Sequence, residues 1–279
     1  MLHRNLIPAV ALVSALLAAS TSASAHDESK YPDWSGAWSR IGNPRWDTSK
    51  PQWDQEPPLT LEYQKIYEAN VADMKAGGQG TDPTYTCLAP GMPRSMIVYH
   101  PMEIVITPNT TYLLIDHIHD SRRIFTDGRD WPAGVEPSFA GYSIGRWIDT
   151  DGDGRYDTLE VETRHMKGPR SFDATGIPLH SDNKTVVKER IYRDKANSNF
   201  LVNEITTLDN ALTRPWTVIK RYQHNADLTE AYRESICAEN NNHLKIGGDD
   251  YMLSADGLLM PVRKGQPPPD LRHFNQTQK

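Results

Sequence analysis

The chain has 279 residues, of which 30 are basic and 36 acidic, giving a formal net charge of −6 at pH 7. A chain with this charge has no overall attraction to nucleic acid or to anionic lipid, so neither is expected as a partner. The sequence also lacks the G-x-S-x-G, P-loop, G-x-G-x-x-G, H-E-x-x-H and C-x-x-C-H motifs. Their absence argues against a serine hydrolase, a nucleotide-binding protein, a zincin and a c-type cytochrome.

Residues 1–25 predict a signal peptide. Arg4 precedes an apolar run at residues 6–19, and the small residues Ala23-Ser24-Ala25 form a cleavage site, so cleavage is expected after Ala25. A retained membrane anchor is the alternative. No later segment has the ~20 apolar residues that a membrane-spanning helix needs. The mature chain is therefore expected to be periplasmic or secreted, without a membrane span.

Residues 26–58 predict an irregular but ordered lead-in, because they contain four tryptophans and disordered segments are poor in aromatic residues. Within it, the Gly36-x-Trp38 pair resembles the opening signature of lipocalin-like barrels, in which the tryptophan plugs one end. The stretch 60–78 then predicts an amphipathic helix, with Thr60 as its cap and Gly77 as its end.

Residues 96–224 predict a series of strands, because segments rich in β-branched and aromatic residues alternate with Pro, Gly, Asn and Asp. No intervening segment has room for a βαβ crossover, so an antiparallel barrel or sandwich is expected. A barrel domain with its flanking helices should occupy residues 59–245, including a short C-terminal helix at 229–243, before a tail at 246–279. The expected strands are 96–100, 102–108, 111–119, 122–127, 142–148, 158–166, 185–193, 201–209 and 216–224.

Cys87 and Cys237 are the only cysteines. In an oxidising compartment two cysteines most simply pair, so we expect a disulfide between them. A bridge that closes a loop of about 150 residues stabilises the fold by at most ~5 kcal/mol in the chain-entropy model. Without a C-x-x-C spacing, a structural zinc site is not expected.

Residues 149–160, DTDGDGRYDTLE, match the D-x-D-x-D-G-x5-E pattern of a calcium loop. The alternative is a hairpin turn, since Asp and Gly also suit turns. Strands rather than helices flank the loop, so a bound ion would be structural and not part of a helix-moving sensor. The predicted ligands are the carboxylates of Asp149, Asp151, Asp153, Asp157 and Glu160 and the backbone carbonyl of Arg155.

His117 and His119 alternate along an expected strand and would project from the same face. Two such imidazoles can begin a transition-metal site, for which His100, His180 or Glu189 could supply a third ligand. The alternatives are hydrogen-bonded or surface histidines, and acid–base use without a metal.

A second pair of acid–base candidates is His180 and Glu189, because burial can bring a glutamate pKa toward neutrality. The alternative is a turn cap beside a cross-strand ion pair, with Glu189 and Arg190 on opposite faces. The predicted catalytic residues are therefore His117, His119, His180 and Glu189.

Arginines and aspartates are dense at residues 122–130. They form either an ion-pair and turn network, or a pocket mouth at which an arginine orients the polar end of a ligand. Trp216, two residues after Arg214, could stack with it. The predicted ligand-binding residues are Arg122, Arg123, Arg129 and Trp216.

Several blocks together resemble a large group of secreted bacterial proteins, most of them without an assigned activity, over residues 90–240. The group shares RRI-x-TDGR, SIGRW, HSD, V-x-ER and TRPWT, which occur here as RRIFTDGRDWP, GYSIGRW, LHSDN, VVKERIY and TRPWTV. The resemblance implies a mainly β, antiparallel lipocalin-like β-barrel. In that group the turn after the RW strand is often shorter, which implies that the calcium loop is an elaboration and its ion is not catalytic.

Two functions remain open at this point. A barrel of this size can enclose one small apolar or aromatic molecule. The protein is either an enzyme of lyase, hydratase or isomerase type that uses His/Glu acid–base chemistry without a nucleotide cofactor, or a non-catalytic carrier of such a ligand. The number of polar residues able to face inward favours the enzyme slightly, and nothing indicates an oligomeric state.

Overall fold

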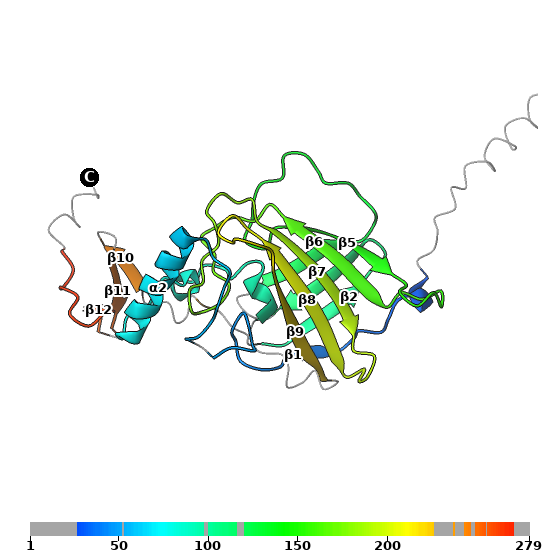
Figure 1. Ribbon diagram of the computed structural model, residues 1–279, viewed down its shortest axis with the longest axis horizontal. Coiled ribbons are helices and arrows are strands. Elements are labelled where there is room, and N and C mark those ends of the chain that lie inside the picture. The colour runs from blue at the N-terminus through cyan, green and yellow to red at the C-terminus, as the bar shows by residue number, and fades with distance from the viewer. Residues whose placement is uncertain are drawn as a thin grey trace, which may run out of the picture.

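The computed structural model describes residues 27–51, 53–97, 100–115, 120–225, 237, 243–246, 249–254 and 256–270. The predicted signal peptide lies outside them. Within them, nine strands close a barrel and three more form a separate sheet (Figure 1). The barrel strands are β1 (Ala37–Arg40), β2 (Met102–Ile106), β3 (Thr110–Ile115), β4 (Asp120–Phe125), β5 (Tyr142–Ile148), β6 (Thr158–Arg164), β7 (Val186–Arg193), β8 (Phe200–Leu208) and β9 (Trp216–Asn225).

The remaining elements are not part of the barrel wall. No described helix combines the length and the apolar character needed to cross a membrane. The elements are the helix α2 (Leu61–Lys75), the small-sheet strands β10 (His243–Ile246), β11 (Asp249–Leu253) and β12 (Leu259–Pro261), and the 3₁₀ helices η1 (Glu28–Lys30), η2 (Pro83–Thr86) and η3 (Arg94–Ile97).

The barrel strands follow one another in chain order, and β1 pairs with β9 to close the wall. Neighbours are antiparallel except β4 and β5, which run parallel where Ile124 pairs with Ser143. A parallel pair needs a crossover connection instead of a hairpin, and the long segment 126–141 supplies it. The predicted mainly β, lipocalin-like barrel is confirmed, with this parallel pair as a departure from a purely antiparallel wall.

The predicted strand at 96–100 is wrong. Arg94–Ile97 form η3, whose residues are all buried. Tyr222 Oη donates to the Met96 carbonyl at 2.6 Å, so η3 packs against the inner face of β9. The preceding Pro93 has no N–H to give to a strand ladder, whereas the first turn of a helix needs none there. The ninth strand of the barrel is instead β1, which belongs to the lead-in.

The tryptophan-rich lead-in is part of the core. Trp34, Trp38 and Trp46 are fully or almost fully buried. Trp38 donates its Nε1–H to the Trp34 carbonyl at 2.9 Å. Gly36 has φ +92°, and a Cβ there would lie 2.5 Å from His224 Nε2, so glycine is required where the chain turns into β1. The Gly-x-Trp pair therefore marks a close approach between β1 and β9.

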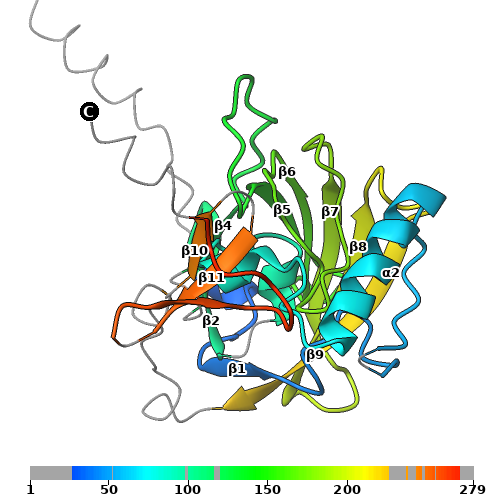
Figure 2. The ribbon, with the colours of Figure 1, turned by 90° about the vertical axis from the view of Figure 1, so that its left-hand side faces the viewer.

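The helix predicted at 60–78 is confirmed as α2, preceded by Thr60 at its N-cap and followed by Gly77 with φ +90°. Figure 2 faces the barrel end at which α2 and the small sheet lie on opposite sides. The predicted disulfide Cys87–Cys237 is also confirmed, with the two Cα atoms 5.5 Å apart. The helix predicted at 229–243 lies largely outside the described residues, and His243 begins β10. The small sheet falls mainly in the segment expected to be a tail.

Candidate functional site

The barrel interior contains a buried ion pair between Arg122 of β4 and Glu189 of β7. Arg122 Nη1 donates to Glu189 Oε1 at 3.0 Å, and Nη2 makes a second, shorter bond to Oε2. Asn203 Nδ2 donates to the same carboxylate at 2.9 Å, and Thr163 accepts from Arg122 at 3.0 Å. The exposed fractions of the two charged side chains are 2% and 0%. Both carboxylate oxygens of Glu189 thus accept hydrogen bonds out of reach of solvent.

Buried apolar side chains surround this ion pair in the described part of the fold. Large residues with almost no exposed surface include Met96, Leu113, Ile124 and Leu159. Burial also raises the pKa of the Tyr222 phenol, and the neighbouring Glu189 carboxylate adds to the effect. Hollows lined by described residues lie on the outer face of β5–β9, at one barrel end and beside α2. The buried side chains of the described strands form a hydrophobic core cluster.

His180 lies in the turn before β7. Its Nδ1 accepts from the Asp182 N–H at 3.1 Å, and its ring centroid is 5.3 Å from that of Tyr63 in α2. Glu189 makes its contacts inside the barrel, and no contact joins these two described residues. The other two predicted catalytic residues, His117 and His119, lie outside the described residues. The described structure therefore does not assemble the predicted acid–base group.

The predicted ligand-binding residues occupy separate environments. Arg122 is buried, while Arg123 is exposed on β4. Arg129 forms an ion pair with Asp127 at 2.6 Å, and its guanidinium carbon lies 3.9 Å from the centroid of the Phe125 ring. These contacts match the ion-pair and turn network that the sequence offered as one alternative.

Trp216, the last of these residues, is in the core. Its ring lies against Phe172 and Trp46, at centroid distances of 5.1 and 6.3 Å. It is therefore a packing residue at the end of the barrel where β9 begins.

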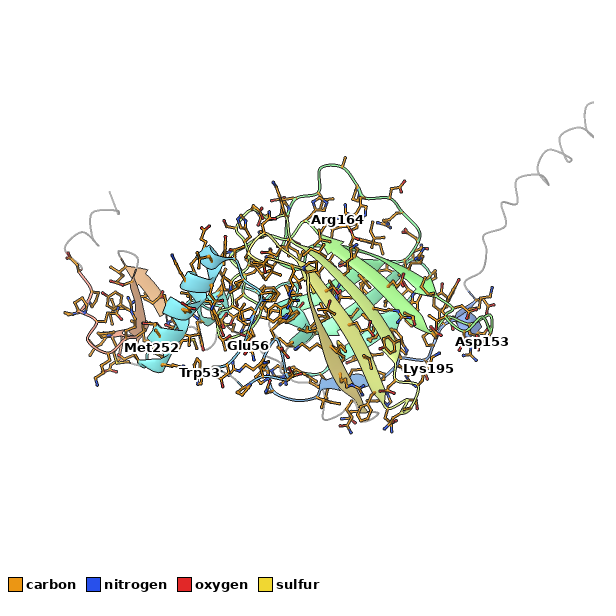
Figure 3. The ribbon with its side chains drawn as sticks, in the orientation of Figure 1. Trp53, Glu56, Asp153, Arg164, Lys195 and Met252 are labelled. Atoms are coloured by element: carbon orange, nitrogen blue, oxygen red, sulfur yellow. A yellow bond between two sulfur atoms is a disulfide. The ribbon has the colours of Figure 1, made fainter. Side chains whose placement is uncertain are left out.

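The acidic loop joins β5 to β6 at the barrel end remote from α2, where Figure 3 labels Asp153. Ligand oxygens of Asp149, Asp151 and Asp153 lie within 4.8 Å of one another. Asp149 accepts from the Gly152 N–H at 2.7 Å and the Gly154 N–H at 2.8 Å. These bonds, the Gly154 bond foremost, lower the pKa of Asp149. Three ionised carboxylates converging on one point suit a hard divalent cation.

The other predicted calcium ligands are engaged elsewhere or contribute only a backbone atom. Glu160 lies within β6, opposite Arg146 of β5, whose Nη2 is 3.0 Å from its carboxylate. Asp157 accepts hydroxyl bonds from Thr150 and Thr158. Calcium takes 6–8 oxygen ligands. The loop therefore offers three converging carboxylates, which leaves positions for water or for a ligand.

A cleft of about 690 Å³ lies between α2, the segment 79–88 and the small sheet. Its volume falls in the range of small-molecule sites, which are typically apolar with a few polar groups at the edges. Its apolar lining comes from Ile66, Ala69, Pro83, Tyr85, Leu88, Pro169 and Val262. Its polar lining includes Asn70, Asp73, Gln79, Asp250 and Arg263.

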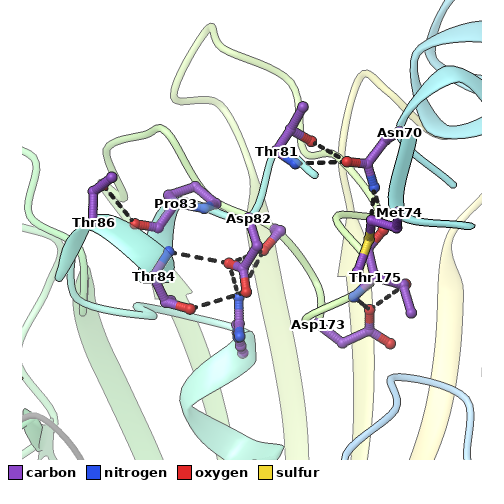
Figure 4. A network of polar contacts seen from close by, with 11 residues as sticks. Asn70, Met74, Thr81, Asp82, Pro83, Thr84, Thr86, Asp173 and Thr175 are labelled. Atoms are coloured by element: carbon purple, nitrogen blue, oxygen red, sulfur yellow. Dashed lines mark hydrogen bonds and ion pairs between the residues drawn. The ribbon is translucent and has the colours of Figure 1, made fainter. Parts of the chain in front are cut away.

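The helix wall of this cleft is anchored by Asn70, a buried residue of α2 (Figure 4). Asn70 Nδ2 donates to the Thr175 carbonyl at 2.5 Å, and its Oδ1 accepts from the Thr81 N–H at 2.6 Å. A Cβ at Gly176 would lie 2.4 Å from Asn70 Nδ2, so glycine is needed for this approach. One side chain thus fixes α2 to two other segments.

The opposite walls are anchored as well. Asp82 forms a buried ion pair with Arg94 of η3, and Arg94 Nη1 also donates to Ser171 Oγ at 2.9 Å. Cys87, next to the lining residue Leu88, is joined to Cys237, which precedes the small sheet. The cleft is therefore preformed, because each of its walls is held by a polar or covalent bond to the rest of the fold.

Sequence patterns did not identify this cleft. Its lining comes from three parts of the chain, residues 66–88, Pro169 and residues 250–263, and none carries a motif. Two features of the sequence could have pointed to the cleft. They are Asn70, a polar residue on the buried face of a helix, and the two cysteines.

Comparison of the chain with models of known protein families, with curated proteins and with solved structures gives no match. What the protein does must therefore be inferred from its geometry.

Proposed function

We propose that the protein is an exported β-barrel protein that binds a small, largely apolar or aromatic molecule without converting it, in the cleft between α2 and the small sheet. The carrying observation is the preformed cleft of about 690 Å³ with an apolar lining. Ile66 and Tyr85 line it with exposed fractions of 44% and 40%. Large apolar side chains left exposed on the walls of a concave surface are a common feature of ligand sites.

Binding is favoured over catalysis by the state of the candidate acid–base residues. Glu189 is already bonded to Arg122 and Asn203, and its side chain has no exposed surface. A general base must reach the proton that it removes, and this carboxylate has neither a free approach nor a neighbouring histidine among the described residues. The cleft is lined by both apolar and polar side chains, as a carrier requires.

The location and the family are part of the same proposal. The predicted signal peptide and the resemblance to secreted bacterial proteins support a periplasmic or secreted protein. The disulfide Cys87–Cys237 is compatible with this, because disulfides persist in oxidising compartments. A structural calcium ion in the acidic loop is also proposed, supported by the three convergent carboxylates.

The test is binding of the neutral fluorescent probe N-phenyl-1-naphthylamine to the purified mature chain. Ile66→Glu places a charge in the cleft wall. Leu61→Glu is the matched control, because Leu61 is on the same helix, is 75% exposed and does not line the cleft. We expect saturable binding by the wild type and by Leu61→Glu, and binding weaker by about tenfold or more in Ile66→Glu, equivalent to about 1.4 kcal/mol.

Equal binding by the two variants, or no saturable binding by the wild type, contradicts the proposal. Native mass spectrometry of protein taken from its own host should also show a co-purified small molecule that Ile66→Glu loses and Leu61→Glu retains.

A further inference from the structure

A second hollow, of about 590 Å³, lies at the end of the barrel opposite the cleft. Figure 3 labels Asp153 and Lys195 at this end and Met252 of the small sheet at the other. The hollow is enclosed by the acidic loop, the last residues of β7 with the segment that follows, and Pro32 and Trp34 of the lead-in. It therefore shares a wall with the proposed calcium loop and none with the cleft.

The hollow is lined by four basic side chains, none of which forms a direct ion pair with another described residue. Lys195 interacts electrostatically with Asp157, and Arg193 with Asp33. On the neighbouring outer face the pattern differs, because Lys188 lies 3.6 Å from Glu162 and Arg146 lies 3.0 Å from Glu160. The unpaired basic residues of the hollow are Arg155, Arg190, Arg193 and Lys195.

The four acidic residues that line the same hollow do not neutralise its basic residues once the acidic loop holds a cation. Asp194 is paired with Arg221 at 2.8 Å. Asp157 accepts from the hydroxyls of Thr150 and Thr158. The two remaining lining acids, Asp151 and Asp153, belong to the calcium triad. A divalent ion there would neutralise them and leave the hollow with an excess of positive charge.

Two buried donors in the hollow also lack an acceptor. The Nε1–H of Trp34, a residue only 2% exposed, and the Nε–H of Arg193 have no hydrogen-bond partner among the described residues. Buried N–H groups are nearly always bonded, and leaving one unpaired costs about 1–3 kcal/mol. Both residues belong to the wall of the hollow, and the two N–H groups themselves have almost no exposed surface.

We propose that this hollow binds the oxyanion group, phosphate or carboxylate, of a small organic molecule. Guanidinium and ammonium groups supply the charge, because arginine in particular matches the geometry of both anions. Tyr156 and Tyr192 add aromatic surface for the organic part. Calcium in the loop strengthens binding, by neutralising the triad and by offering coordination positions that the loop leaves open. Both this contribution and the net positive charge of the hollow rest on the proposed calcium loop, because the four lining acids otherwise equal the four lining bases in number.

Isothermal titration with phenyl phosphate, with benzoate and with neutral benzyl alcohol tests the site. Lys195→Gln and Arg155→Gln each remove one unpaired cation from the exposed rim, and Arg155→Gln keeps the backbone carbonyl proposed as a calcium ligand. Lys188→Gln is the matched control, because it removes the same charge from β7 outside the hollow. We expect both anions to bind the wild type and Lys188→Gln alike, and to bind each hollow variant more weakly by about tenfold, with benzyl alcohol giving no heat.

The site is overturned if neither anion binds, or if Lys188→Gln weakens binding as much as Lys195→Gln, which would indicate general surface charge. Calcium is titrated separately in the absence of anion, so a failure of the calcium loop is distinguishable from a failure of the anion site. Anion binding that depends on Lys195 but is unchanged by saturating calcium overturns the calcium contribution. If one anion binds and the other does not, the result identifies which oxyanion the site takes and supports the assignment.

Discussion

Arg122 and Glu189 meet across the barrel interior, from β4 to β7, through two hydrogen bonds between guanidinium and carboxylate. Neither charge touches solvent. Burying two charges is costly, so such a pair is weak evidence of stabilisation by itself, but removing one partner strands the other charge in the core.

Glu189→Gln is therefore expected to lower the free energy of unfolding by about 3–5 kcal/mol in urea denaturation. Glu162→Gln is the control, because its ion pairs on the outer face of β6 are solvent-exposed and contribute about 0–1 kcal/mol. Replacing both partners, as Arg122→Met with Glu189→Leu, should recover much of the loss. Similar losses of unfolding free energy for Glu189→Gln and Glu162→Gln would show that breaking the buried pair costs no more than breaking an exposed one.

The sequence predicts which face of its strand Glu189 occupies, but not the partner that it meets there. Alternation along VVKERIY places Glu189 and Arg190 on opposite faces, and the structure buries Glu189 and exposes Arg190. The partner could not be predicted, because Arg122 is 67 residues earlier and meets Glu189 only through the order and register of the intervening strands. The same limit explains η3, since Met96 and Ile97 have the composition of a strand but are buried by contact with β9.

The acidic loop shows the limit of local spacing in another way. The pattern correctly grouped Asp149, Asp151 and Asp153, because they are close in the chain and one turn brings them together. In a helix–loop–helix site the chain after the loop folds back to supply the twelfth residue. Here the hairpin register pairs Ile148 with Thr158, so Glu160 lies along the ladder opposite Arg146.

The disulfide Cys87–Cys237 fastens the segment beside the cleft to the chain that leads into the small sheet. The double variant Cys87→Ser, Cys237→Ser should lose up to about 5 kcal/mol of unfolding free energy, the value expected for a closed loop of this length. It should also bind the naphthylamine probe more weakly, because a wall of the cleft is released. Titration of free thiols in unfolded, unreduced wild type should detect almost none, and two reactive thiols would contradict the bridge.

Lys220 of β9 is 2% exposed, and its ammonium donates to the backbone carbonyls of Arg45 and Trp46. Burial lowers its pKa to about 7, although Asp173 and Asp47 oppose the shift. An unfolded lysine keeps its proton up to about pH 10.4. Between these two pKa values the unfolded state binds more protons, so raising the pH favours the folded state.

The unfolding free energy of the wild type should therefore rise by about 2–3 kcal/mol between pH 7 and pH 9, relative to Lys220→Met, and the difference should be flat below about pH 6. Denaturant titrations of both proteins at matched pH values measure it. The comparison removes groups common to both proteins, including the carboxylates of the acidic loop. Parallel pH profiles for the two proteins would mean that Lys220 titrates normally in the fold.

Calcium titration can decide between two ligand sets for the acidic loop, the one that the sequence spacing predicts, with Glu160, and the one that the observed geometry suggests, without it. If the ion is held by the convergent triad, Asp151→Asn should weaken calcium binding by about tenfold or more, because one of three converging charges is lost. Glu160→Gln should leave calcium affinity near the wild-type value, since Glu160 pairs with Arg146, at a stability cost of about 0–1 kcal/mol. Isothermal titration measures the calcium affinity of each protein.

Melting curves provide a second readout, because calcium at 100 times its dissociation constant should stabilise the wild type by about 2.7 kcal/mol, and EDTA should remove that gain. Identical melting curves with calcium and with EDTA would reject the bound ion. Equal losses of calcium affinity in Asp151→Asn and Glu160→Gln would show that the loop folds back on binding, so that its twelfth residue, Glu160, ligates the ion as the spacing alone predicts.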